Sequence, residues 1–123
     1  MTSIFNQFFN KGKDDREPAE IEYINDKKIE NDQITITAQI YGRVQGVGFR
    51  FTTDQLAKEL GVDGFVRNEE DGSVYVEASA KDEVMKSFIF ELAKSPSPSA
   101  SVNKVVVKYE DHPTNHQGFT IQH

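Results

Sequence analysis

The stretch that decides the fold is Ile34–Gly61, ITITAQIYGRVQGVGFRFTTDQLAKELG, because it passes from strand to helix periodicity through a glycine-rich segment. Residues 34–42 alternate β-branched with other side chains, which is typical of a strand. After the glycines, apolar side chains recur at helical spacing until Gly61 ends the pattern. The stretch therefore predicts a strand, a tight loop and a helix. The helix face expected to be buried carries Phe49, Thr53, Leu56, Ala57 and Leu60.

The sequence downstream of this unit predicts a hairpin and a second helix. Residues 62–68 (VDGFVRN) and 73–80 (SVYVEASA) have the pattern of strands, and the Asp71-Gly72 pair between them favours a tight turn. Residues 81–94 (KDEVMKSFIFELAK) have an apolar side typical of an amphipathic helix. Its predicted buried residues are Val84, Met85, Phe88, Ile89 and Leu92.

The last part of the chain completes a familiar order of elements. The proline-containing linker SPSPSAS at 95–101 cannot continue the helix. Residues 103–111 (NKVVVKYED) predict a fourth strand, and 118–123 (GFTIQH) a short fifth strand or a terminal extension. The order βαββαβ predicts an α+β fold of the ferredoxin-like type, with two helices on one face of an antiparallel sheet.

The first 32 residues differ from the rest in composition. Residues 1–32 are rich in charge, so we expect a flexible N-terminal extension and a folded domain over residues 33–123. Ile4, Phe5, Phe8 and Phe9 recur at helical spacing near the start. They predict either a helix that docks on a partner or membrane, or a short frayed segment, and the second is favoured because short helices are marginal.

Charge and composition limit the classes of function. The chain has 123 residues, no cysteine and a net charge of −6. These values favour one domain, exclude disulfides, thiolate metal sites and cysteine nucleophiles, and disfavour general binding to nucleic acids. No apolar run approaches the roughly 20 residues that span a bilayer. We expect a cytoplasmic protein, acting as a monomer and without contact to a membrane.

The glycine-rich loop GRVQGVGFR is suited to hold an anion. Gly42, Gly46 and Gly48 allow backbone N–H groups to converge, and the helix N-terminus adds partial positive charge. Arg50 lies where its guanidinium can bind two phosphate oxygens. The alternative, that the glycines serve only the geometry of the turn, is about equally supported by the residues alone.

The loop does not fit the two best-known nucleotide-binding patterns. The sequence GxxxxGK followed by Ser or Thr is missing, and the glycine spacing differs from GxGxxG. Binding of ATP, GTP or NAD is therefore poorly supported.

Asn68 ends the second predicted strand, which the fold brings close to the glycine loop. Its amide can donate and accept hydrogen bonds, so it could orient a water toward a bound phosphorus. On spacing alone, the favoured interpretation is an Asn that begins the turn before Asp71-Gly72.

The sequence offers no conventional catalytic base or metal site. His112, His116 and His123 are expected on the surface, away from the loop. The acidic run at 69–71 is expected to form a solvated turn, because carboxylates would repel a phosphate. No serine has an evident histidine partner, so a serine hydrolase is not supported.

Taken together, GRVQGVGFR, a helix ending in LGV and DGFVRNEEDGSVYVEA resemble the signature of the acylphosphatase family. The resemblance runs from about Ile34 to the C-terminus, and it leaves the first 33 residues uncovered. It departs from the family pattern at Phe65, where tryptophan is usual, and in the linker SPSPSAS, which replaces a shorter link containing Gly-Pro.

This resemblance implies hydrolysis of the carboxyl-phosphate bond of a small acyl phosphate, without a metal or another cofactor. It implies that Arg50 and Asn68 are catalytic, Arg50 binding phosphate and Asn68 positioning the attacking water. The N–H groups that would assist Arg50 belong to Gln45, Gly46, Val47, Gly48 and Phe49. A substrate oxygen can accept the proton from water, which agrees with the lack of a protein base.

Two other classes of function remain as alternatives. The first is a binding module that keeps the anion pocket but works through its N-terminal extension. The second is an RNA-recognition domain, which shares the strand order but needs aromatic residues on the central strands, where Tyr75 is the main candidate.

Overall fold

The computed structural model describes residues 16–28 and 32–123. The part of the chain that it describes forms a six-stranded sheet in the order β1-β5-β2-β4-β3-β6. The elements are β1 (Glu20–Tyr23), β2 (Gln33–Arg43), α2 (Phe49–Leu60), β3 (Asp63–Asn68), β4 (Val74–Lys81), α3 (Asp82–Lys94), β5 (Ser101–Glu110) and β6 (Phe119–Gln122).

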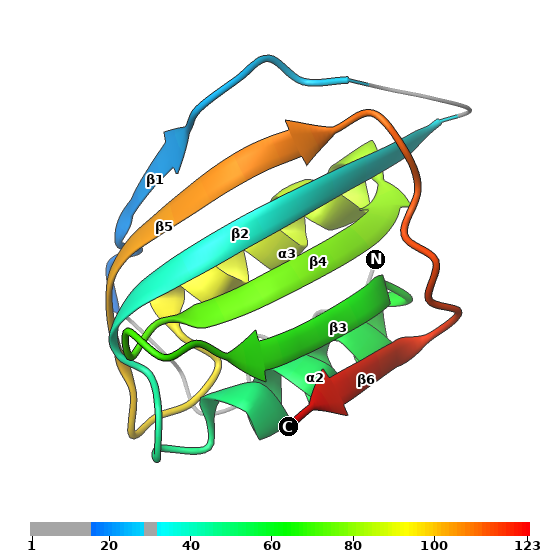
Figure 1. Ribbon diagram of the computed structural model, residues 1–123. Helices are drawn as coiled ribbons and strands as arrows, with labels where there is room; N and C mark the ends of the chain where they lie inside the picture. The colour runs from blue at the N-terminus through cyan, green and yellow to red at the C-terminus, as the bar shows by residue number, and fades with distance from the viewer. Residues whose placement is uncertain (1–15, 29–31) are drawn as a thin grey trace, which may run out of the picture.

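The central part of the sheet confirms the predicted ferredoxin-like arrangement. Strands β5, β2, β4 and β3 pair antiparallel, in the order expected of a βαββαβ chain. Both helices lie on the same face of the sheet (Figure 1). The other face of the sheet is open to the viewer in this orientation.

The core lies between the helices and the covered face of the sheet. The predicted helix faces supply its largest buried side chains, including Phe49, Leu56, Phe88 and Leu92. The alternating residues Ile34, Ile36, Ala38 and Ile40 of β2 point to the same side and are almost fully buried. Leu60 and Val84, predicted to be buried, pack partly exposed at the margin of this core.

The two outer strands pair parallel with their neighbours, so the complete sheet is mixed around the predicted antiparallel centre. β6 pairs parallel with β3, and β1 pairs parallel with β5. The C-terminal segment 118–123 thus contains a fifth strand of the domain, one of its two predicted forms. Its parallel direction places the C-terminal end of β6 beside the C-terminal end of β3.

Strand β1 lies within residues 1–32, the segment predicted to be a flexible N-terminal extension, and adds a short strand to the sheet. Its residues Glu20–Tyr23 cover the free edge of β5, and Ile21 is the one residue among them that is partly buried. The Asn25 side chain continues this pairing, because its amide donates to Tyr109 O and accepts from Tyr109 N. The Tyr23 ring stacks on the Tyr109 ring. The residues with helical spacing at positions 4–9 lie outside the described residues.

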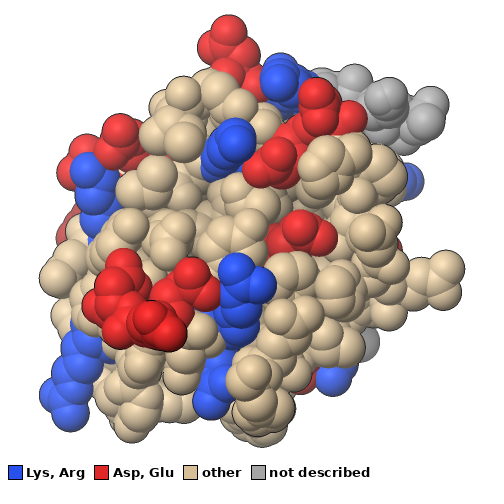
Figure 2. All heavy atoms as spheres, viewed as in Figure 1, with Lys and Arg blue, Asp and Glu red and all other residues tan. Residues whose placement is uncertain are grey.

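The open face of the sheet has no continuous basic area. Acidic and basic side chains are interspersed over it (Figure 2). Tyr75, the candidate for base stacking, packs on Phe65 and lies under the Arg67 guanidinium, 4.5 Å from its ring centre. Arg67 is in turn paired with Glu69. Within residues 16–28 and 32–123, no helix is long and apolar enough to cross a membrane.

Candidate active site

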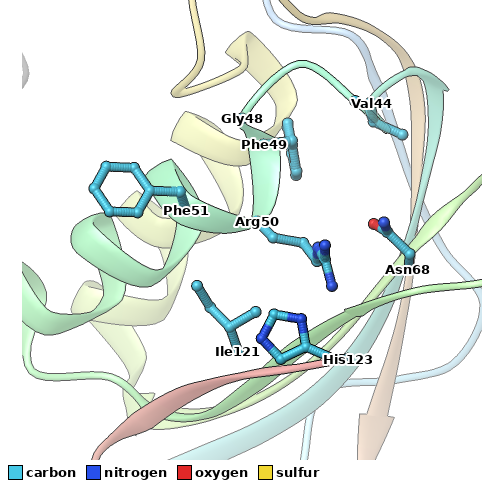
Figure 3. Close-up of a pocket in the computed structure, with 9 residues that line it drawn as sticks. Val44, Gly48, Phe49, Arg50, Phe51, Asn68, Ile121 and His123 are labelled. Carbon is cyan, nitrogen blue, oxygen red and sulfur yellow. The ribbon is translucent and has the colours of Figure 1, made fainter.

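A cavity of about 260 Å³ opens where the glycine loop, the start of α2 and the ends of β3 and β6 meet. The two side chains singled out from the sequence, Arg50 and Asn68, both line it. They extend into it from opposite sides, one from the helix and the other from the strand (Figure 3). The lining residues are Val44, Gly46, Gly48, Phe49, Arg50, Phe51, Asn68, Ile121 and His123.

The loop reaches the helix through two glycines in the left-handed region of backbone space. Gly46 has φ 74° and Gly48 has φ 78°, values that other residues rarely adopt. Gly48 is the N-cap of α2, and its carbonyl accepts the first helical hydrogen bond from Thr52 N. The N–H groups of the first helical turn therefore have no partner inside the helix, and the helix dipole adds positive potential at this end.

Arg50 lies in the first turn of α2 and is held by β6. Its Nη1 donates to the backbone oxygen of Gln122 at 3.0 Å. This bond uses one nitrogen of the guanidinium and leaves the other N–H groups available to an anion. The arginine is half-buried, so its charge is partly shielded from water.

Asn68 is the last residue of β3, where it pairs with Val74 of β4. Its Oδ1 atom is buried and has no hydrogen-bond partner among the described residues. A buried acceptor without a partner is costly unless something completes it. In this position the amide can accept a hydrogen bond from a molecule in the cavity.

The Gln45 side chain, which does not line the cavity, connects the loop to the β3–β4 turn. Its Nε2 donates to the backbone oxygens of Glu69, at 2.8 Å, and Ser73, at 2.9 Å. The loop is thereby fixed relative to Asn68, which directly precedes this turn. The sequence interpretation assigned Gln45 only a backbone role and missed this contact, because it spans elements that are far apart in the sequence.

The structure separates the other predicted site residues into two groups. Gly46, Gly48 and Phe49 line the cavity. Gln45 and Val47 do not line it, so whether their N–H groups contact an anion stays a prediction.

His123 corrects the prediction that the histidines lie away from the loop. Parallel pairing places Gln122 of β6 opposite Arg67 of β3, so the next residue, His123, lies beside Asn68 and lines the cavity. Its ring approaches the Arg50 side chain (Figure 3). The prediction failed because the pairing partner of residues 118–123 was not deduced from the sequence.

The acidic turn at residues 69–71 contributes no carboxylate to the cavity lining. Glu69 pairs with Arg67, and Glu70 and Asp71 are exposed. Hydrogen bonds from Ser73 Oγ and Ser73 N hold the pKa of Asp71 below its ordinary value. Because no carboxylate from this turn lines the cavity, the cavity can accept an anion although the chain as a whole is acidic.

The described residues contain no group of three or more histidine, aspartate or glutamate side chains placed to hold a metal ion. The fold and the cavity define an α+β protein with a pocket suited to a small tetrahedral anion, between a strand-to-helix loop and a neighbouring strand end.

Comparisons with known proteins agree with this class of protein and identify the family. The family model for acylphosphatase matches residues 36–121. The acylphosphatase of Enterococcus faecalis is 49% identical over 69 residues, which is 56% of this chain and 76% of the relative. That of Thermotoga maritima is 44% identical over 85 residues, covering 69% of this chain and 92% of the relative. The crystal structure of acylphosphatase from Bacillus subtilis aligns with a TM-score of 0.70 and 29% identity, over 73% of this chain and 99% of that one.

The chain belongs to the acylphosphatase family, whose enzymes hydrolyse acyl phosphates.

Proposed function

We propose that this enzyme hydrolyses its acyl phosphate substrate in the cavity between the glycine loop and β3, with Arg50 and the loop amides holding the phosphoryl group and Asn68 orienting water. The observation that carries this proposal is the meeting of Arg50 and Asn68 in one cavity, although they are 18 positions apart in the sequence. The buried, unpartnered Oδ1 of Asn68 supplies a second argument, since it can accept a hydrogen bond from the attacking water.

The reaction transfers the phosphoryl group from a carboxylate to water. The water oxygen forms a bond to phosphorus while the bond between phosphorus and the acyl oxygen breaks. The carboxylate leaves with that electron pair, and a proton of the water passes to a phosphoryl oxygen. The products are a carboxylate and inorganic phosphate, so no protein side chain has to be oxidised, reduced or covalently modified.

The residues of the cavity match the electrostatic demands of this reaction. Negative charge builds on the phosphoryl oxygens in a loose transition state, where positioned donors stabilise it. Arg50 offers several N–H groups in one plane, and its bond to Gln122 O fixes their direction. A carboxylate is a good leaving group, which reduces the need for a general acid. Asn68 restricts the water to an orientation from which it can attack.

The finer assignments of cofactor, location and assembly belong to the same proposal. We propose a reaction that needs no metal, a cytoplasmic enzyme that acts as a monomer, and a catalytic unit formed by residues 33–123 with residues 1–32 as an accessory extension. The absence of cysteine supports the location, since it agrees with a reducing compartment. The interspersed charges on the open sheet face and the negative net charge argue against a nucleic-acid partner.

The decisive test is release of inorganic phosphate from benzoyl phosphate by the purified full-length protein with EDTA present. We expect release well above the rate in buffer and unchanged by EDTA. Arg50→Ala and Asn68→Ala should each lower the rate by at least about 100-fold, the scale for losing one transition-state donor. Wild-type activity that both variants retain would place the reaction elsewhere on the molecule, and activity lost on adding EDTA would contradict the metal-independent reaction.

A further inference from the structure

Behind the phosphate-binding loop, a buried serine holds one of its carbonyl groups. Ser97 Oγ donates to the backbone oxygen of Val47 at 2.6 Å, and Ser97 is only 2% exposed. Ser97 lies in the serine-rich linker at residues 95–101, which follows α3. Neither Ser97 nor Val47 lines the cavity, so this contact can influence an anion there only through the backbone of the loop.

The contact fixes the direction of a peptide group at the cavity wall. The peptide between Val47 and Gly48 is planar and trans, so its C=O and its N–H point in opposite directions. Because Ser97 binds the C=O, the N–H of Gly48 points away from the linker. Gly48 lines the cavity. Its positive φ is part of the backbone conformation in which the Val47 carbonyl meets Ser97. Ser97 therefore acts on the anion site through the orientation of one amide.

Ser97 is itself held rigidly within the linker. Its N–H donates to Ser95 Oγ at 3.2 Å, and its carbonyl accepts from Ser95 Oγ at 2.8 Å. The N–H of Ala100 also donates to the carbonyl of Ser97, at 3.2 Å. Because the N–H and the carbonyl of Ser97 are both hydrogen-bonded, its backbone is held in place and its side chain is positioned to reach Val47 O.

The segment before β1 adds a second layer of support. Arg16 donates from Nη2 to Ser95 O at 3.0 Å and from Nη1 to Ser97 O at 3.3 Å. Nη1 also lies 3.5 Å from Ala100 O. The Arg16 guanidinium thus donates to several backbone carbonyls of the linker. In the same segment, Ala19 N donates to Ala93 O at the end of α3. A charged donor shared by several carbonyls is stronger than a neutral hydrogen bond.

We propose that Ser97 is a positioning residue that sets the phosphate-binding conformation of residues 46–48, and that Arg16 of the N-terminal extension steadies it through the linker. The proposal rests on the proposed function, because it assumes that the loop amides bind phosphate. It gives the extension a role at the active site although none of the described residues of the extension lines the cavity. The chain of contacts runs from Arg16 to Ser97, then to Val47 and Gly48.

The first experiment measures the dissociation constant of inorganic phosphate by NMR titration of the full-length protein, without turnover. Ser97→Ala is expected to raise this constant about three- to tenfold, as for the loss of one hydrogen bond. The matched control is Ser99→Ala, an exposed serine of the same linker, which should leave the constant unchanged. A folded Ser97→Ala protein with a lower melting temperature and wild-type phosphate affinity would reduce Ser97 to a structural residue and overturn the proposal.

The second experiment tests whether Arg16 acts through Ser97. Arg16 is exposed, so Arg16→Ala should fold, and it is expected to weaken phosphate binding about two- to threefold, with Glu17→Ala as the control at the neighbouring exposed position. In a protein that already carries Ser97→Ala, the change at Arg16 should have no further effect. Additive effects, or no effect of Arg16→Ala alone, would overturn the role of the extension.

The wild-type titration separates this proposal from the proposed function. Wild-type protein that neither binds phosphate nor hydrolyses benzoyl phosphate would contradict the proposed function itself. Wild-type protein that does both, with a Ser97→Ala variant that binds phosphate equally well, would leave the proposed function standing and contradict only the positioning role.

Discussion

Replacing Arg50 by lysine and by alanine separates the two contributions of its guanidinium, its charge and its geometry. Arg50 gives one N–H group to Gln122 O, and in the proposed mechanism its other N–H groups bind the phosphoryl oxygens. Lysine keeps the positive charge but offers a single nitrogen, so it cannot bind Gln122 O and two phosphoryl oxygens in the same way. Alanine removes both contributions.

The expected sizes follow from these contacts. Lysine loses one charge-assisted hydrogen bond, about 1.5–3 kcal/mol, which lowers kcat/KM about 10- to 150-fold. Alanine also loses the attraction between two unit charges about 4 Å apart, roughly 4 kcal/mol at an effective dielectric constant near 20, or about 1000-fold. The order wild type, lysine, alanine is therefore predicted, with a difference of up to about 1000-fold in kcat/KM between the two variants.

The assay is steady-state hydrolysis of benzoyl phosphate, with thermal unfolding to show that each variant is folded. Arg43→Ala is the matched control, because Arg43 is an exposed arginine at the end of β2 that does not line the cavity. It should change kcat/KM by less than about twofold at physiological salt. If Arg50→Ala were no worse than Arg43→Ala, the guanidinium would not hold the phosphoryl group.

Three further predictions concern the water, the sheet and the response to acid. Asn68→Ala should lower kcat at least about 100-fold yet change inhibition by inorganic phosphate less than about threefold, because the proposed partner of the amide is the attacking water. A large loss of phosphate affinity would contradict this assignment. Gly64→Ala should lower the free energy of unfolding, measured in urea, by more than about 3 kcal/mol. The reason is that the added Cβ would lie 1.9 Å from Glu77 O at a φ of 143°. A loss below about 1 kcal/mol would show that β3 and β4 can separate there. Hydrogen bonds from Ser73 lower the pKa of Asp71, so the stability that ionised Asp71 contributes is present at neutral pH and is lost as pH falls below about 4. The melting temperatures of wild type and Asp71→Asn should therefore differ at neutral pH and converge in acid, and a constant difference would contradict this.

The sequence predicted the central fold because local periodicity and tertiary packing agree there. The alternation in β2 and the helical spacing after Gly48 both point apolar side chains to the same core. Strand β1 was missed because its four residues, EIEY, lie in a highly charged segment and contain only a short alternation. The free edge of β5 and the Asn25 contacts with Tyr109 order it, and both are non-local.

The site could be predicted only as far as its motifs carry local geometry. Arg50 follows the glycines closely, at the start of α2, so their proximity followed from the sequence, and Asn68 was placed by the strand order. The anchors Gln45 and Ser97 were not identified as anchors, because each acts through a side chain that reaches a distant backbone carbonyl. His123 was misplaced because the parallel register of β6 with β3 is a property of the assembled sheet.

The most direct test of the central claim is the position of inorganic phosphate in a crystal structure of the full-length protein grown at saturating phosphate. The account predicts an anion within hydrogen-bond distance of the Arg50 guanidinium and of N–H groups in residues 46–50, with a water bound to Asn68 on its open side. Phosphate bound only elsewhere, with the Arg50 side chain free of it, would contradict the account.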